Sequence, residues 1–306
     1  MPNWTTDDIP DQGGRTAVVT GANSGLGYQT AVALAAKGAH VVLACRSAER
    51  GAEAVARLTA AVPGADVALA SLDLADLESV RAFADTVDVL DLLVNNAGVM
   101  ALPTRRTTKQ GFEMQVGTNH LGHFALTGLL LPKLRPGGRI VTVSSGLHKY
   151  GRIEDLADLQ SEKQYKPWRV YGLSKLANVL FFTELDRRLR AVDAPLRSAG
   201  SHPGYASTNL QASGPGADGS TLAKLFGAFG NRVFAQSDAM GALPSLRAAT
   251  DPDAQGGDFY GPSGLGEQRG YPKRVAYSKA GHDVAAANRL WAESERLTGV
   301  AVPIPT

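Results

Sequence analysis

From residue 15 onward, short apolar segments alternate with longer segments whose apolar residues recur at helical spacing. Four of the short segments are almost continuously apolar, which indicates strands buried on both faces by helices. The expected strands are 15–20, 40–45, 66–71, 89–95, 139–144 and 195–201, and the expected helices are 25–37, 48–61, 76–85, 111–134 and 171–190. This alternation predicts an α/β fold, a doubly wound Rossmann-type domain with a mostly parallel sheet and helices on both faces.

After residue 201 the pattern is less regular. The segment 211–230 is expected to cover a substrate pocket, and its apolar residues fit either a lid or the core: Leu222, Leu225, Phe226 and Phe229. Helical spacing also occurs at 221–229 and 237–249, and 258–260 is a candidate last strand. No repeat or linker interrupts the chain, so residues 1–306 are expected to form one domain, with 1–13 as an N-terminal extension.

Composition narrows the function classes. Lys plus Arg number 31 and Asp plus Glu number 29, a formal net charge of +2, which does not favour a nucleic-acid binder. The single cysteine, Cys45, excludes an intramolecular disulfide framework and a cysteine-based zinc cluster. No apolar run approaches the roughly 20 residues of a membrane span, and the first residues are polar and acidic. We therefore expect a cytoplasmic globular protein without a membrane span.

A glycine-rich turn lies between the first expected strand and the first expected helix. It reads Thr20-Gly-Ala-Asn-Ser-Gly-Leu-Gly27. Glycines allow the backbone to approach a pyrophosphate, and the N–H groups at a helix N-terminus bind anions. Turns also recruit glycine for structural reasons alone, but the position in the first βα unit favours a dinucleotide site. The turn lacks the lysine of a P-loop, which disfavours phosphate-transfer ATPases.

The end of the second expected strand indicates which dinucleotide binds. An acidic residue there would bind the ribose 2′-hydroxyl of NAD, but the sequence reads Ala44-Cys-Arg-Ser47. Arg46 is suited to pair with a 2′-phosphate, although an ordinary solvent-exposed arginine at a helix start is the alternative. The sequence therefore favours NADP(H) over NAD(H).

Tyr171 has a lysine four residues later, Lys175. On a helix these two side chains share one face, so the ammonium can lie near the phenol. A nearby cation stabilises the phenolate and lowers the tyrosine pKa from its usual value of about 10, which gives a usable general acid/base. Taken alone, the pair also fits simple packing and a solvated charge.

Several motifs occur together in one order: the glycine turn, Asp73-Leu74, Asn95-Asn-Ala-Gly98, Asn119, Ser145, Tyr171 with Lys175, and Pro203-Gly204. In this order, over residues 14–210, the chain resembles the short-chain dehydrogenase/reductase family. The spacing GxxxGxG resembles the family's reductase-type branch and not the sugar-nucleotide epimerases. The segment between Ser145 and Tyr171, together with 119–124, resembles the retinol-dehydrogenase-like branch. Many animal members of that branch carry an N-terminal membrane anchor, and the resemblance does not specify a substrate.

The resemblance implies roles for individual residues. Tyr171 would exchange a proton with the substrate oxygen, and Lys175 would bind the nicotinamide ribose. Ser145 would bind the substrate carbonyl, with Ser144 packing on the other face, and Asn119 would position a water or make a structural bond. The implied cofactor-binding residues are Gly21, Asn23, Ser24, Gly25, Leu26, Gly27, Arg46, Asp73, Leu74, Asn95, Ala97, Gly98, Tyr171, Lys175, Pro203, Gly204 and Thr208. Pairing of two copies through helices 111–134 and 171–190 is also implied.

Three histidines invite comparison with a metal site, but no acid or cysteine accompanies them at ligand spacing: His120, His123 and His202. We expect no metal and interpret them as structural or substrate-lining. The leading hypothesis is an NADP(H)-dependent oxidoreductase that interconverts a carbonyl and an alcohol on a hydrophobic small molecule. The alternatives are a non-catalytic NADP(H)-binding regulator and a sugar-nucleotide epimerase or dehydratase.

Overall fold

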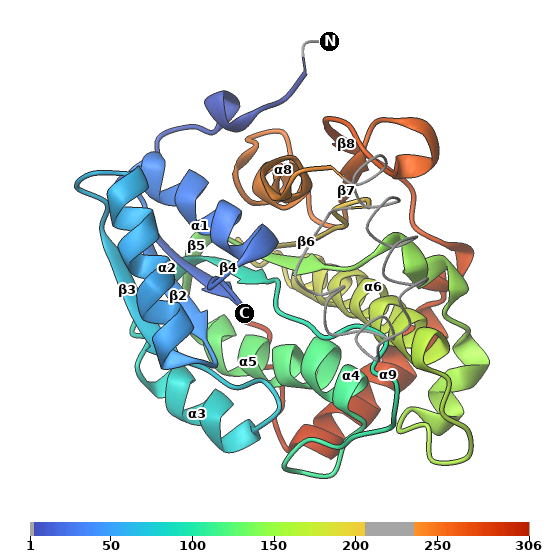
Figure 1. Cartoon of the computed structure of the whole chain (residues 1–306). Coiled ribbons are helices and arrows are strands. Elements are labelled where there is room, and N and C mark those ends of the chain that lie inside the picture. Colours follow the sequence, from blue (N-terminus) through green and yellow to red (C-terminus); the bar gives the residue numbers. More distant parts are fainter. Residues whose placement is uncertain (1–2, 206–235, 306) are drawn as a thin grey trace, which may run out of the picture.

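The computed structural model describes residues 3–205 and 236–305, in which eight strands form one sheet (Figure 1). The strand order is β3-β2-β1-β4-β5-β6-β7-β8. Neighbouring strands pair in parallel from β3 to β7, and β8 pairs with β7 in the antiparallel direction. The bounds are β1 Thr16–Thr20, β2 His40–Cys45, β3 Val67–Ser71, β4 Leu90–Asn95, β5 Leu134–Val143, β6 Arg197–Ser201, β7 Phe259–Pro262 and β8 Pro272–Arg274.

Alternate residues of the central strands enter two different cores. Val18 of β1 and Leu93 of β4 belong to one hydrophobic cluster, whereas Val19 and Leu92 belong to the other. All four are fully buried. The near-continuous apolar character of these strands thus reflects a sheet covered on both faces.

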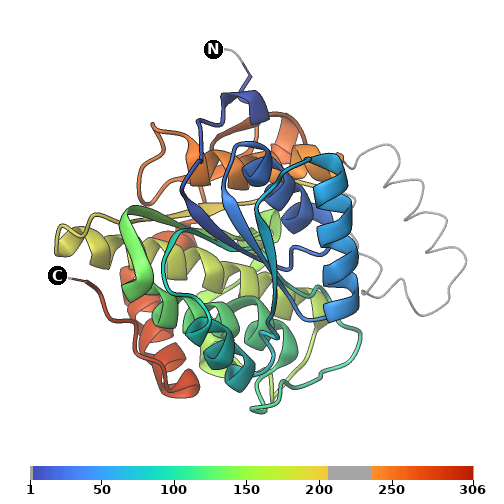
Figure 2. The same ribbon diagram turned by 90° about the vertical axis from the view of Figure 1, so that its left-hand side faces the viewer.

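One helical layer covers each face of the sheet, as Figures 1 and 2 show. The cluster that contains Val18 and Leu93 is covered by four helices: α3 (Leu77–Asp85), α5 (Gly122–Leu130), α6 (Pro167–Ala191) and α9 (Val284–Thr298). The cluster that contains Val19 and Leu92 is covered by three helices: α1 (Gly25–Ala36), α2 (Ala48–Ala61) and α8 (Asp238–Thr250). The predicted doubly wound, mostly parallel α/β architecture is confirmed.

The expected helix 111–134 was wrong in its interior and at its ends. Helix α4 covers only Met114–Val116, and Gly117–Leu121 form a π-helical turn before α5. Strand β5 then begins at Leu134 instead of Arg139, because Leu134 pairs with Leu90 and an irregularity accommodates the Pro-Gly-Gly that follows. A single π-helical turn of five residues is too short for hydrophobic periodicity to distinguish it from α-helix.

Other elements begin elsewhere than expected or were missed. Helix α6 starts at Pro167, four residues before the predicted start, with the proline in its first turn. Helix α9 and strand β8 were not predicted, although Asp283 caps the N-terminus of α9 and Gly299 ends it in a left-handed conformation. The expectations for 211–230, including the helix 221–229, lie outside the described residues. None of the helices in the described ranges combines the length and apolar character needed to cross a membrane.

Candidate active site

The predicted site residues follow the carboxyl ends of adjacent parallel strands. The glycine turn follows β1, Asn96 follows β4, Ser145 lies two residues beyond β5, and Pro203 follows β6. Because parallel strands end at the same sheet edge, the topology brings these segments together. The site is therefore built from segments far apart in the sequence.

The turn after β1 has the conformation that its glycines predict. Gly21 and Gly25 have φ angles of 66° and 57°, in the left-handed region. A Cβ on Gly27 would lie 2.6 Å from the carbonyl oxygen of Gly21, so the first turn of α1 packs directly on the loop. Ser24 caps α1, but its side chain accepts no capping hydrogen bond. The turn thus leaves the N-terminus of α1 free to bind an anion.

Thr20, which the sequence analysis did not single out as a site residue, joins this turn to the segment after β4. Its hydroxyl oxygen accepts the N–H groups of Asn96 and Ala97, each at 2.9 Å. Asn95 points away from the site and donates to the Thr127 hydroxyl at 2.9 Å. The structure therefore gives Asn95 a supporting position. Ala97 instead borders the turn, since a Cβ on Gly21 would lie 3.0 Å from it.

The residues after β2 and β3 lie further along the same edge. Arg46 is exposed and immediately precedes Ser47, the N-cap of α2. Asp73 is half-buried, and its carboxylate accepts the N–H of Ala75 at 2.9 Å. Leu74 is buried against Gly122 of α5, where a Cβ would lie 2.4 Å from the Leu74 carbonyl oxygen. Of these, Arg46 alone presents an exposed charge.

Helix α6 carries Tyr171 and Lys175, which are 5% and 3% exposed. The Lys175 ammonium lies 5.7 Å from the centre of the Tyr171 ring and donates to the Val143 carbonyl at 3.2 Å. Asn178 donates to the same carbonyl at 3.1 Å. Ser144 instead donates to the Lys175 carbonyl at 2.8 Å, so it holds α6 against β5.

Burial dominates the electrostatics of this pair. It raises the pKa of Tyr171 to about 12, an effect that the Ser145 hydroxyl beside the phenol opposes. Burial also lowers the pKa of Lys175 to about 8. The loss of hydration therefore raises the tyrosine pKa in the protein alone, opposite to the lowering that the sequence predicts from the lysine.

Asn119 lies on the π-helical turn and is fully buried. Its side-chain oxygen accepts the N–H of Val99 at 2.8 Å, and its amide nitrogen donates to the Val99 carbonyl and to the Ser174 hydroxyl. A Cβ on Gly98 would lie 3.0 Å from that oxygen and 3.6 Å from the Lys175 nitrogen. Asn119, Gly98 and Lys175 are therefore close together, and the asparagine side chain is fully engaged in structural bonds.

Each of the three histidines has a structural partner. His120 pairs with the Ser294 hydroxyl at 2.8 Å, and His202 lies 3.2 Å from Glu267. His123 joins the Thr20 hydroxyl to the Asn119 carbonyl, at 2.9 and 3.0 Å. Burial lowers the pKa of His120 to about 3 and that of His123 to about 4, so both are neutral. In the described ranges, no group of three His, Cys, Asp or Glu side chains could hold a metal ion.

The loop after β6 is held by residues from the last third of the chain. Gly204 has a φ of 68°, and a Cβ there would lie 2.4 Å from the carbonyl oxygen of Gln268. Gln236 donates to the Pro203 carbonyl at 2.6 Å. Thr208 lies outside the described residues.

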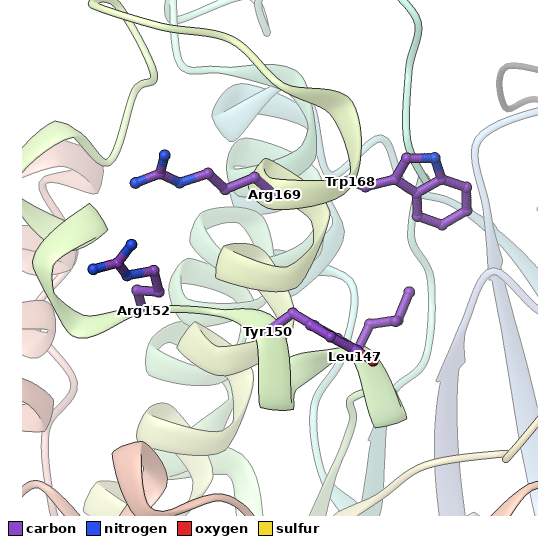
Figure 3. Close-up of a pocket in the computed structure, with 5 residues that line it drawn as sticks. All are labelled: Leu147, Tyr150, Arg152, Trp168 and Arg169. Carbon is purple, nitrogen blue, oxygen red and sulfur yellow. The ribbon is translucent and has the colours of Figure 1, made fainter.

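A pocket of about 430 Å³ lies between the 3-10 turn after Ser145 and the first turn of α6 (Figure 3). Trp168 packs edge-on against Tyr171, with ring centroids 6.4 Å apart, and the Leu147 N–H donates to the Ser145 hydroxyl at 3.2 Å. Figure 3 shows Trp168 and Leu147 at one end of the pocket and Arg152 and Arg169 at the other. The lining residues are Leu147, Tyr150, Arg152, Trp168 and Arg169.

Residues 15–216 match the family model for short chain dehydrogenases. The chain belongs to the short-chain dehydrogenase/reductase family. It is 40% identical to mouse retinol dehydrogenase 14 over 305 residues, covering 94% of this chain and 86% of that protein. It is also 40% identical to mouse polyprenol dehydrogenase, with coverages of 95% and 86%.

A solved structure extends this similarity to the fold. The crystal structure of an uncharacterized protein from Mycobacterium paratuberculosis aligns with a TM-score of 0.83 and 43% identity, over 99% of this chain and 100% of that one. These relatives confirm the resemblance to the retinol-dehydrogenase-like branch. Membership makes the protein an NAD(P)-dependent oxidoreductase of this family.

Proposed function

We propose that this protein uses NADP(H) to interconvert an alcohol and a carbonyl on a hydrophobic small molecule, with Tyr171 as general acid/base. The observation that carries the proposal is the buried phenol beside the Ser145 hydroxyl and the Lys175 ammonium. The open N-terminus of α1 fits a dinucleotide pyrophosphate. The proposed cofactor-binding residues are those named from the sequence.

When bound, the nicotinamide supplies or accepts the hydride. During reduction, the Ser145 hydroxyl donates a hydrogen bond to the substrate carbonyl and Tyr171 delivers a proton to the developing alkoxide. The raised pKa of Tyr171, about 12, keeps the phenol protonated for this step. During oxidation the phenolate form of Tyr171, which the adjacent Lys175 ammonium stabilises, takes the alcohol proton and becomes the phenol.

The test of this mechanism is Tyr171→Phe. We expect turnover to fall by at least about 100-fold, because the proton donor is lost, while the dissociation constant for NADPH stays within about twofold. Tyr260→Phe is the control, since that phenol is also buried and burial raises its pKa to about 12, but it lies in β7 and bonds to Asp258. Turnover that survives in Tyr171→Phe would exclude the proposed mechanism.

The pocket supports a hydrophobic substrate. Its apolar end is formed by Leu147 and Trp168, which contact Ser145 and Tyr171 respectively. Both arginines are paired, Arg152 with Glu154 at 3.4 Å and Arg169 with Asp155. Apolar pockets with few polar groups bind apolar ligands. Two relatives are named for retinol and polyprenol, both apolar alcohols, which favours a substrate of this class.

Trp168→Ala tests the pocket assignment. Removal of the indole should raise KM for long-chain alcohols by about tenfold or more, since a buried aromatic surface is worth at least about 1.4 kcal/mol. KM for a short alcohol that does not reach the pocket should change little. Equal effects on short and long alcohols would place the apolar part of the substrate elsewhere.

A further inference from the structure

His148 follows Ser145 by three residues and was not singled out by sequence. It lies in a short 3-10 turn, Gly146–Tyr150, that Ser145 caps, and its side chain is completely buried. Its Nδ1 lies 2.6 Å from the Ser145 carbonyl oxygen, which also accepts the His148 backbone N–H at 3.0 Å. The imidazole therefore holds the same residue whose hydroxyl faces Tyr171.

The other ring nitrogen binds a distant segment. The backbone N–H of Ser278, between β8 and α9, donates to Nε2 of His148 at 3.1 Å. A backbone N–H can only donate, so Nε2 must be the acceptor and Nδ1 must carry the proton. Both nitrogens are then satisfied by one neutral tautomer. A second proton, on Nε2, would break the bond to Ser278.

The ring is also fixed by packing. Phe259 of β7 contacts it edge-on, with centroids 5.5 Å apart, and Phe259 itself stacks on Phe182 of α6 at 5.7 Å. Burial lowers the pKa of His148 to about 4. The neutral tautomer required by the two hydrogen bonds is therefore the form present at neutral pH.

We propose that His148 is a positioning residue for Ser145, and that the Ser278 N–H holds its imidazole in the orientation that fixes the Ser145 backbone. The inference rests on the proposed function, because it assumes that the Ser145 hydroxyl binds the substrate oxygen. It adds a requirement that this function alone does not make: a segment 130 residues away sets the geometry of the serine. Small displacements of an orienting group reduce turnover much more than cofactor binding.

Ser278 offers a substitution that leaves the ring in place. Its φ is −64°, the angle that proline requires, so Ser278→Pro deletes the N–H without forcing a new backbone angle. The Ser278 hydroxyl is buried without a hydrogen-bond partner, so Ser278→Ala retains the N–H and is the matched control. We expect kcat to fall by about tenfold in Ser278→Pro and to stay within about twofold in Ser278→Ala.

Substitutions of His148 complete the experiment. His148→Leu loses both bonds and should lower kcat about 10- to 100-fold per folded molecule, while the NADPH dissociation constant changes less than about threefold. His148→Asn can still donate to the Ser145 carbonyl and should recover part of that loss. Urea unfolding of each variant corrects kcat for the folded fraction.

Two results would overturn the inference. One is equal kcat in Ser278→Pro and Ser278→Ala, and the other is a His148→Leu enzyme with lowered stability but wild-type kcat per folded molecule. Tyr171→Phe, measured in parallel, separates the two proposals. If that variant is inactive while His148→Leu is fully active, only the positioning role fails.

Discussion

The proposed role of Lys175 conflicts with its burial. Catalysis as proposed needs an ammonium beside the phenol, but the residue is 3% exposed and no carboxylate is paired with it among the described residues. Burial alone moves its pKa from 10.5 to about 8. A shift of this size corresponds to about 3 kcal/mol of unfavourable free energy for the charged form in the folded protein. The buried Lys175 ammonium therefore lowers the stability of the folded protein, although the proposed mechanism needs its charge.

Lys175→Met is therefore expected to abolish turnover and to stabilise the protein without cofactor by about 1–3 kcal/mol at pH 7. The Val143 carbonyl keeps its hydrogen bond from Asn178, so no buried acceptor is left unpaired. Because the folded pKa lies below the unfolded value, wild-type stability rises with pH between about 8 and 10.5. The advantage of the variant should be complete below pH 8 and should disappear by about pH 10.5, as measured by urea unfolding.

Lys133→Met is the matched control for this prediction. The Lys133 ammonium donates to the carbonyls of Ala84 and Val87, each at 2.7 Å, near the end of α3. Its removal leaves both acceptors without this partner, so it should destabilise the protein. If Lys175→Met destabilises the protein at pH 7 as much as Lys133→Met does, the buried Lys175 ammonium does not lower its stability.

At the scale of elements, α6 joins the chemistry to the core. Its first half carries Tyr171 and Lys175, and its second half contacts α9 through Arg188. The Glu184 carboxylate accepts hydrogen bonds from Arg187 at 2.7 Å and Arg188 at 2.6 Å, with its side chain 1% exposed. Arg188 then lies 4.2 Å from the centre of the Trp291 ring of α9.

Glu184→Gln should cost about 1–2 kcal/mol at pH 7, since two partly exposed guanidinium groups lose their carboxylate. Burial acts to raise the pKa of Glu184, but the hydrogen bonds from Arg187 and Arg188 outweigh it and lower the pKa. A carboxylate with a lowered folded pKa stabilises above its unfolded pKa, and this gain is lost as pH falls. The difference between wild type and variant in urea unfolding should therefore shrink below about pH 4.5.

The exposed Glu293–Arg296 pair on α9 provides the comparison. It has the same spacing of three residues and the same forked contact, but its side chains are 39% and 68% exposed. Glu293→Gln should cost less than about 0.5 kcal/mol. Equal costs for Glu184→Gln and Glu293→Gln would mean that burial does not strengthen the α6 pair.

Most strands and helices could be predicted because apolar spacing records which face is buried, as in β1 and α2, whose bounds differ from the prediction by at most one residue. The π-helical turn at Gly117–Leu121 could not, since five residues are too few for hydrophobic periodicity to separate π from α geometry. Helix α9 could have been predicted from Asp283 and Gly299. Both are local capping residues, and the sequence analysis did not use them.

At the scale of the whole molecule, the sheet explains which site residues the sequence could indicate. Tyr171 and Lys175 lie on one helix, so their spacing places them together. His148 and Ser278 are joined only by the fold, and no local pattern relates them. The glycine turn and Arg46 could be predicted in part. Each follows an expected strand, and parallel strands end at one edge of the sheet, but the sequence does not show how close they come.

The same arrangement links cofactor binding to global stability. The proposed site uses the segments after β1, β2, β4 and β6 together with α6, so unfolding of the sheet destroys it, and a ligand that binds only the folded state raises the unfolding temperature. NADPH should stabilise more than NADH if the exposed Arg46 and the N-terminus of α2 bind the 2′-phosphate.

Arg46→Ala should reduce the thermal shift with NADPH to about that with NADH and leave the NADH shift unchanged, because only the phosphate contact is removed. Each tenfold loss of NADPH affinity removes about 1.4 kcal/mol of ligand stabilisation at saturating cofactor. Arg289→Ala removes an exposed arginine from α9, in the helical layer opposite α2, and should change neither shift. Equal shifts with the two cofactors in the wild type would contradict the assignment of Arg46, since a phosphate bound by a guanidinium must contribute to affinity.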